Sequence, residues 1–290
     1  MRFSGSYVAL VTPFHADGSV NFEKLRELVE WHVQQGTDGI VALGTTGESS
    51  TMSHEEDDDV ARAVIETVNG RIPVICGAGS NSTQTQLEKS RRYHDMGADG
   101  LLLITPYYNK ANDEGMYRHF ATVADTVDTP VILYNVPGRT GCSISPACCA
   151  RLAAHPNIAG IKEASGNIGY TAQIAKLVND DFCMFSGNDD MIVPIMSLGG
   201  CGVISVWANI CPKEVHELTN AFVAGDIAKA REIQLKYLDL IGALFCEVNP
   251  IPIKEAMNQL GMEVGGYRLP LCEISAAGRE RVRRALEVLG

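Results

Sequence analysis

Short apolar runs alternate with longer segments of helical periodicity along most of the chain. Eight of these runs are predicted to be strands, at residues 6–11, 39–43, 72–76, 100–104, 130–134, 158–162, 182–186 and 201–206. Each run is nearly continuous in apolar residues, as in strands that are buried on both faces of a parallel sheet. Strands and helices that alternate eight times predict an α/β fold, the (β/α)8 TIM barrel.

The segments between the runs carry helix start signals, with Asn21 and Ser53 as the expected N-caps of two helices. From about residue 212 onward only helical periodicity remains. We therefore expect a barrel domain over 1–224 and a C-terminal helical region over 225–290. A doubly wound sheet competes with the barrel, but it usually has fewer strands in this length, and no G-x-G-x-x-G follows the first strand.

Composition and charge narrow the possible functions. The 290 residues are 46% hydrophobic and 20% charged, which indicates a packed globular protein. A formal net charge of −11 argues against nucleic acid and anionic membranes as partners, although a local cationic pocket can still bind a small anion. The nine cysteines are scattered, and no pair of C-x-x-C motifs indicates a metal site. We expect reduced thiols in a cytoplasmic protein without a signal peptide or transmembrane segment.

Lys162 ends the sixth apolar run, and a turn-rich segment follows it at 164–167. In a barrel this position is the carboxyl end of a strand, where ligands bind and chemistry occurs. Partial desolvation disfavours the charged form of a lysine, and a neutral amine forms Schiff bases with carbonyl compounds. The alternative interpretation is a surface lysine that leaves the strand paired with Glu163.

Hydroxyl-bearing residues and a glycine stand at the ends of other predicted strands. They are Thr45, Thr46, Tyr107, Tyr108, Tyr134 and Gly187. In a barrel these residues open on the same mouth as the lysine. Gly187 leaves room for a ligand to approach the backbone.

Schiff-base chemistry requires proton transfer at oxygen and nitrogen, which a phenol such as Tyr134 can perform. Thr45 and Tyr108 can extend a route to water, because hydroxyls both donate and accept hydrogen bonds. The turn at 44–47 can offer backbone N–H groups to a carboxylate. Arg139, in the loop after the fifth strand, can bind a second carboxylate through both of its N–H arms.

Each of these residues also has a purely structural interpretation. Tyr134 can be an amphipathic cap with a packed ring, and Tyr107–Tyr108 can be loop packing or an interface anchor. The two threonines at 45–46 can serve turn geometry alone, and Arg139 can form a surface ion pair. The catalytic interpretation rests on their common position at strand ends.

Three motifs resemble the dihydrodipicolinate synthase family, also called 4-hydroxy-tetrahydrodipicolinate synthases. They are Gly-Thr-Thr-Gly-Glu at 44–48, Tyr-Asn-Val-Pro-Gly-Arg-Thr at 134–140 and Gly-Ile-Lys-Glu-Ala-Ser at 160–165. The resemblance covers essentially the whole chain. It implies a class I aldolase-type lyase, in which pyruvate forms an imine with Lys162 and its enamine attacks L-aspartate-4-semialdehyde. The product of that reaction leads to lysine and diaminopimelate.

The resemblance also implies how protons move and how the protein assembles. Tyr134 is then the proton donor and acceptor, with Thr45 and Tyr108 completing the relay. Tyr108 reaches the pocket of a neighbouring subunit, in a homotetramer built from tight dimers. No metal and no organic cofactor is implied.

Substrate binding is implied for three further residues. Thr46 and Ile204 contact pyruvate, and Arg139 holds the carboxylate of the semialdehyde.

A lysine effector site is implied for the inhibited members of the family, at the tight-dimer interface. The residues here that match parts of it are Ser49, Ser50, His54, Asn81 and Tyr107. Asp57 and Thr85 depart from the pattern, since the inhibited members commonly have a histidine and a glutamate there. Loss of a carboxylate at Thr85 removes a partner for the ammonium group of the effector, which Asp57 replaces only in part. We expect weak or absent inhibition by lysine.

Two other functions compete with this interpretation. N-acetylneuraminate lyase and 2-keto-3-deoxy-sugar-acid aldolases share the barrel, the lysine and the tyrosine. Thr46 and Arg139 favour a short carboxylated aldehyde over the polyols that these sister enzymes accept. A non-catalytic barrel that only binds pyruvate-like ligands or a partner protein is the second competitor, and the intact lysine, tyrosine and threonine set argues against it.

Overall fold

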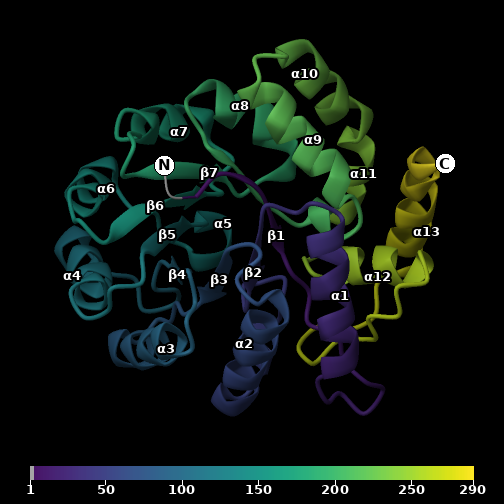
Figure 1. The fold of residues 1–290 in the computed structure, drawn as a ribbon, viewed down its shortest axis with the longest axis horizontal. Helices are drawn as coiled ribbons and strands as arrows, with labels where there is room; N and C mark the ends of the chain where they lie inside the picture. The colour runs from purple at the N-terminus through teal and green to yellow at the C-terminus, as the bar shows by residue number, and fades with distance from the viewer. Residues whose placement is uncertain (1–2) are drawn as a thin grey trace. The chain divides into compact units, whose positions relative to one another are not determined.

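Eight strands form a closed barrel in the order β1 to β8, which confirms the predicted fold. Strands β1 to β7 are labelled in Figure 1. The structure is a computed structural model that describes residues 3–290; Met1 and Arg2, where the expected barrel domain begins, lie outside the described residues. The strands are β1 (Gly5–Ala9), β2 (Gly39–Ala42), β3 (Val74–Gly77), β4 (Gly100–Ile104), β5 (Val131–Asn135), β6 (Ile158–Glu163), β7 (Cys183–Ser186) and β8 (Gly202–Ser205). Their ends lie within two residues of the expected ones.

Helices separate the strands and make up the C-terminal part of the chain. They are α1 (Phe22–Gln34), α2 (His54–Val68), α3 (Thr83–Asp95), α4 (Asp113–Ala124), α5 (Pro137–Thr140), α6 (Pro146–Ala153), α7 (Ile168–Ala175), α8 (Ile192–Ser197), α9 (Pro212–Val223), α10 (Ile227–Lys236), α11 (Leu238–Leu244), α12 (Ile251–Gln259) and α13 (Ala276–Ala285). Asn21 caps α1 by accepting from the backbone N–H of Lys24, and Ser53 forms a capping box with Glu56 on α2. Both predicted N-caps are therefore confirmed.

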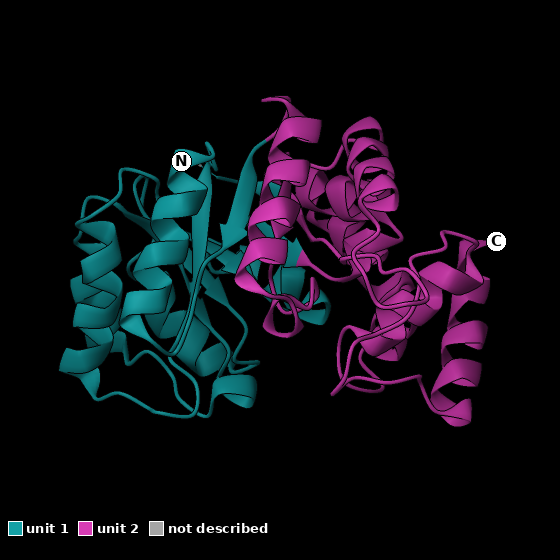
Figure 2. Cartoon of the chain, turned by 90° about the horizontal axis from the view of Figure 1, so that it is seen from below, with its two compact units in different colours: residues 1–5, 73–204 teal, residues 6–72, 205–290 magenta. Residues whose placement is uncertain are grey.

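The chain divides into two compact units, shown in different colours in Figure 2. Unit 1 contains the described part of residues 1–5 together with 73–204, and unit 2 contains 6–72 and 205–290. The domain boundary expected at 224/225 falls between α9 and α10, inside unit 2, and stays a prediction.

Unit 1 holds β3 to β7 and most of β8, with α3, α4, α6 and α7 lying outside its strands (Figure 1). The parallel register places Tyr134 of β5 opposite Lys162, and Lys162 opposite Phe185 of β7. Strands β5, β6 and β7 are buried throughout, as expected for strands of a parallel sheet that is covered on both faces. One element was not expected: residues 137–140 form the short helix α5, where the sequence predicts a loop.

Unit 2 holds β1, β2 and all helices from α9 to α13. β1 pairs with β2 in parallel, with Tyr7 opposite Gly39. A Cβ atom on Gly39 would lie 2.1 Å from the Tyr7 ring, so glycine is the residue that this packing admits. Among the described residues, no helix has the length and apolar character needed to cross a membrane.

The imidazole of His32 is buried in unit 2 on α1, where its Nδ1 lies 3.0 Å from the Thr37 hydroxyl. Burial lowers the pKa of His32 from its ordinary value of 6.5 to about 3. As the pH falls below 6.5 the unfolded chain takes up a proton that the folded chain refuses until about pH 3. The free energy of unfolding therefore decreases with falling pH in this window, by up to about 1.4 kcal/mol per pH unit.

Replacing His32 with glutamine is expected to reduce this acid sensitivity, because glutamine can keep a hydrogen bond to Thr37 but does not titrate. The measurement is the free energy of unfolding from urea titrations at pH 7 and pH 5. His54→Gln, at an exposed histidine, is the control and should behave as the unmodified chain does. An undiminished difference between the two pH values in His32→Gln would contradict the prediction.

Candidate active site

Lys162 lies at the carboxyl end of β6 and is only 6% exposed. Its ammonium nitrogen stands 4.5 Å from the centre of the Tyr134 ring, which belongs to the neighbouring strand. The alternative of a surface lysine paired with Glu163 is therefore wrong, because the side chain is enclosed. Lys162 and Tyr134 are brought together as the strand-end rule predicts.

Burial lowers the pKa of Lys162 from 10.5 to about 8. The negative charge of Asp189 opposes this effect and raises the pKa, whereas the positive charge of Arg139 lowers it further. A pKa of about 8 leaves about a tenth of the amine neutral at pH 7, compared with less than about a thousandth for an ordinary lysine. The site therefore supplies a nucleophilic amine under physiological conditions.

Gly187 forms one wall of the space around the lysine. Its backbone N–H donates to the Glu163 carbonyl oxygen at 2.7 Å. A Cβ atom on Gly187 would lie 2.5 Å from the Cβ of Ala164 and 3.1 Å from the Cε of Lys162. Any side chain here would push against the lysine, so the glycine predicted after the seventh strand preserves the position of the amine.

A hydrogen-bond network lies on the opposite face of β5 and β6. Because side chains alternate along a strand, Asn135 and Glu163 point away from Tyr134 and Lys162. The Asn135 amide donates to Glu163 at 2.9 Å and accepts from the backbone N–H of Ile144 at 3.1 Å. Burial raises the pKa of Glu163. The network ties the ends of the two strands to the segment that follows α5.

Three further residues near Lys162 were not among the predicted site residues: Asn135, Glu163 and Asp189. Asn135 and Glu163 are the immediate neighbours of Tyr134 and Lys162, so their strand-end position was an available signal. Asp189 is 2% exposed and follows β7 by three residues, just after the predicted Gly187.

The remaining predicted site residues of unit 1 differ in exposure. Arg139 is exposed on α5, close enough to Lys162 to influence its charge. Tyr107 and Tyr108 are 40% and 93% exposed, and Tyr108 has a φ of 70°. Ile204 on β8 is 1% exposed.

In unit 2 the two predicted threonines lie in the turn after β2. Thr45 is half-buried, and Thr46 is 3% exposed. Thr46 accepts a hydrogen bond at 3.0 Å from the side-chain amide of Asn249. Glu48 has a φ of 55°, a left-handed conformation that is uncommon for a residue other than glycine. Its carboxylate lies 2.8 Å from the Lys254 ammonium in an ion pair whose side chains are both fully buried.

The expected effector residues are distributed over both units. Ser49 and Ser50 begin a short 3-10 helix in unit 2, and His54 is the first residue of α2. In unit 1 the backbone carbonyl of Asn81 accepts from the Asn109 side chain at 2.9 Å, two residues after Tyr107. The two departing positions also differ, since Asp57 is 1% exposed and Thr85 is half-buried.

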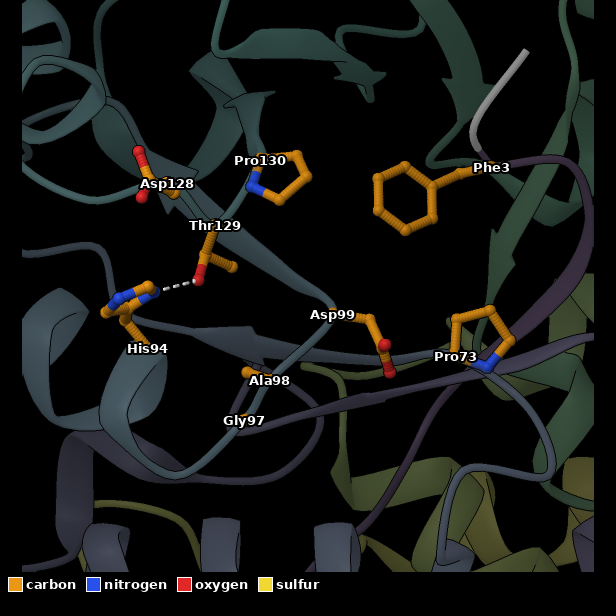
Figure 3. A pocket seen from close by; sticks show the side chains of 9 residues that line it. All are labelled: Phe3, Pro73, His94, Gly97, Ala98, Asp99, Asp128, Thr129 and Pro130. Atoms are coloured by element: carbon orange, nitrogen blue, oxygen red, sulfur yellow. Dashed lines mark hydrogen bonds between the residues drawn. The ribbon is translucent and has the colours of Figure 1, made fainter.

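A cavity of about 440 Å³ lies elsewhere in unit 1 (Figure 3). Pro73, Asp99 and Pro130 line it immediately before β3, β4 and β5. His94 and Thr129 approach each other on its wall, with 2.7 Å between the imidazole Nδ1 and the hydroxyl (Figure 3). The cavity is therefore at the amino ends of these strands, whereas barrel enzymes place their chemistry at the carboxyl ends.

The fold and the site together define a (β/α)8-barrel protein with a buried lysine amine at the carboxyl end of strand β6. A model of the dihydrodipicolinate synthetase family matches residues 2–289. A 4-hydroxy-tetrahydrodipicolinate synthase from Thermoanaerobacter sp. (strain X514) is 52% identical over 289 residues, which cover 99% of this chain and 97% of the relative. The chain belongs to the dihydrodipicolinate synthetase family, a family of enzymes.

Solved structures of family members are similar over the whole chain. The chloride-inhibited dihydrodipicolinate synthase from Acinetobacter baumannii, complexed with pyruvate, has a TM-score of 0.96 at 45% identity and covers 98% of both chains. The enzyme from Cyanidioschyzon merolae with lysine bound has a TM-score of 0.96 at 39% identity, covering 99% of this chain and 98% of that one.

The two charges near Lys162 are expected to shift its pKa in opposite directions. Asp189→Asn removes the negative charge that raises the pKa and should lower it, whereas Arg139→Ala removes the positive charge that lowers the pKa and should raise it. The measurement is the pH dependence of Lys162 modification by an amine-reactive reagent, followed by peptide mass spectrometry. The exposed Lys176 in the same digest is an internal reference. Shifts in the same direction would refute the electrostatic assignment.

Proposed function

We propose that this chain condenses pyruvate with L-aspartate-4-semialdehyde through an imine on Lys162, giving 4-hydroxy-tetrahydrodipicolinate for lysine and diaminopimelate biosynthesis. The observation that carries the proposal is the enclosed amine of Lys162, with a pKa of about 8, beside the ring of Tyr134. Support also comes from relatives that are named 4-hydroxy-tetrahydrodipicolinate synthase. They are 52% and 50% identical to this chain in sequence over nearly their full length.

The reaction begins when the neutral amine attacks the ketone carbon of pyruvate. The resulting carbinolamine loses water to form the imine, and loss of a methyl proton gives the enamine. The enamine carbon bonds to the aldehyde carbon of the semialdehyde, whose oxygen takes up a proton. The amino group of the semialdehyde then attacks the imine carbon and displaces Lys162, which closes the ring and regenerates the free amine.

Each of these steps moves a proton, and we assign the transfers to Tyr134 as donor and acceptor. Its ring centre lies 4.5 Å from the reacting nitrogen, and its phenol O–H is a group able to donate and accept the proton. Thr45 and Tyr108 extend the relay toward water in this proposal, which rests on their family motifs and on the capacity of hydroxyls to donate and accept.

In the proposal, different residues bind the two substrates. Thr46 and Ile204 contact pyruvate, and Gly187 leaves space beside the amine for it. Arg139 binds the semialdehyde carboxylate through its guanidinium, which is exposed. The imine itself withdraws electrons from the methyl carbon, so the proposed reaction uses no metal and no organic cofactor.

We assign the protein to the cytoplasm and to a homotetramer built as a dimer of dimers. The cytoplasmic assignment is supported by the cysteines, which form no disulfide among residues 3–290 and of which six are buried. The assembly is supported by Tyr107 and Tyr108, because large exposed aromatic side chains are typical of protein interfaces. Tyr108 then enters the site of a neighbouring copy.

Borohydride reduction in the presence of pyruvate tests the proposed imine. The unmodified chain should gain the mass of one reduced pyruvate at Lys162, because reduction makes the imine permanent. Lys162→Ala should keep its circular dichroism spectrum and lose both the adduct and the condensation activity. Lys176→Ala, at an exposed lysine of the same unit, should form the adduct normally. If the chain without substitutions formed no pyruvate adduct at Lys162, the alternative of a non-catalytic binding protein would be favoured.

Turnover is expected to be insensitive to lysine at millimolar concentration, because Thr85 offers no carboxylate to the effector's ammonium group and the Asp57 side chain is buried. Initial rates with and without lysine measure this. Thr85→Glu restores a carboxylate and should make the enzyme more sensitive. Strong inhibition of the unmodified enzyme would refute the expectation, and so would a Thr85→Gln variant that gains as much sensitivity as Thr85→Glu.

A further inference from the structure

Thr46 is contacted by a residue from the far end of the chain. The amide nitrogen of Asn249, in the segment between α11 and α12, donates to the Thr46 hydroxyl oxygen at 3.0 Å across a separation of 203 residues. Both side chains are buried, with 3% exposure for Thr46 and 6% for Asn249. A buried side-chain contact of this kind fixes the orientation of both groups, because neither can exchange it freely for water.

Other contacts hold the turn itself in place. The Lys254 ammonium reaches both the Glu48 carboxylate, at 2.8 Å, and the Gly266 carbonyl oxygen, at 2.6 Å. The backbone N–H of Arg268 approaches the second oxygen of Glu48 at 3.4 Å. The position of the turn is thus set by contacts to Glu48, two residues beyond Thr46, whereas Asn249 contacts the Thr46 hydroxyl itself.

The direction of the Asn249 hydrogen bond determines what the hydroxyl can do. A threonine hydroxyl has one proton to donate and two lone pairs that accept. Asn249 supplies an N–H and occupies one lone pair, so the hydroxyl proton is not used in this contact. It is available to an acceptor, and a carboxylate is the strongest one that the proposed substrates bring.

We propose that Asn249 is a positioning residue that orients the Thr46 hydroxyl to donate to the carboxylate of pyruvate. The inference rests on the proposed function, in which Thr46 binds pyruvate. It assigns to the C-terminal helical region a part in selecting 2-oxo acids over neutral ketones. Asn249 acts through Thr46 and does not itself touch the substrate.

The test compares pyruvate with acetone, which has the same ketone and methyl group but no carboxylate. For each compound, the rate of borohydride trapping on Lys162 is measured as a function of concentration. Asn249→Ala should raise the half-saturating concentration of pyruvate about tenfold, the effect of weakening one hydrogen bond to a charged group. Acetone trapping should change less than about twofold, and it also reports that the Lys162 site is intact.

Asn249→Asp gives a sharper result. A carboxylate can only accept, so it takes the Thr46 proton and also repels the substrate's charge. Pyruvate affinity should fall further than in Asn249→Ala, with acetone again little affected. Asn258→Ala is the matched control, because Asn258 is exposed on the adjoining helix α12 and its side-chain hydrogen bonds go to the backbone of Gly265 and Val264. It should trap both compounds normally.

A double variant distinguishes action through Thr46 from an independent effect. Thr46→Val removes the hydroxyl, so adding Asn249→Ala should cost nothing more in pyruvate affinity. Additive losses, or equal losses for pyruvate and acetone, would overturn the assignment of Asn249. Failure of the unmodified chain to trap pyruvate at all would instead overturn the proposed function, so the two failures are distinguishable.

Discussion

The Lys162 amine is kept from water at the carboxyl end of β6, and the chemistry proposed for this chain depends on that burial. Desolvation lowers its pKa to about 8, while Asp189 and Arg139 act on the pKa in opposite directions. The absence of a side chain at Gly187 leaves the amine in place. A lysine of the same sequence on a solvated surface would be almost fully protonated at neutral pH and unable to attack a ketone.

The strand ends are organised by the alternation of side chains. One face of β5 and β6 carries Tyr134 and Lys162, to which we assign the chemistry, and the other carries Asn135 and Glu163. The second pair forms the hydrogen bond that joins the two strands and contacts the segment after α5. Adjacent residues therefore have different roles in the proposal, because Tyr134 and Lys162 carry the proposed chemistry while Asn135 and Glu163 join the two strands by a hydrogen bond.

The sequence predicted the strands and the strand-end residues, because both follow from the pattern of neighbouring residues. The apolar runs predicted the ends of every strand to within two residues. The position of Lys162, Tyr134 and Gly187 at strand ends identified them as candidate site residues. Residues 137–140 were expected as a loop because a four-residue helix is too short to show periodicity. Asn249 could not be found in this way, because its contact with Thr46 spans 203 residues and no local pattern reports such a distance.

The separation of 203 residues between Thr46 and Asn249 determines when their contact can form during synthesis of the chain. The turn after β2 is synthesised before residues 73–204, whereas its partners Asn249, Lys254 and Arg268 are synthesised after them. Unit 2 combines residues 6–72 with residues 205–290, and residues 73–204 of unit 1 are synthesised between them. The contact between Thr46 and Asn249 can therefore form only after the segment between α11 and α12 has been synthesised.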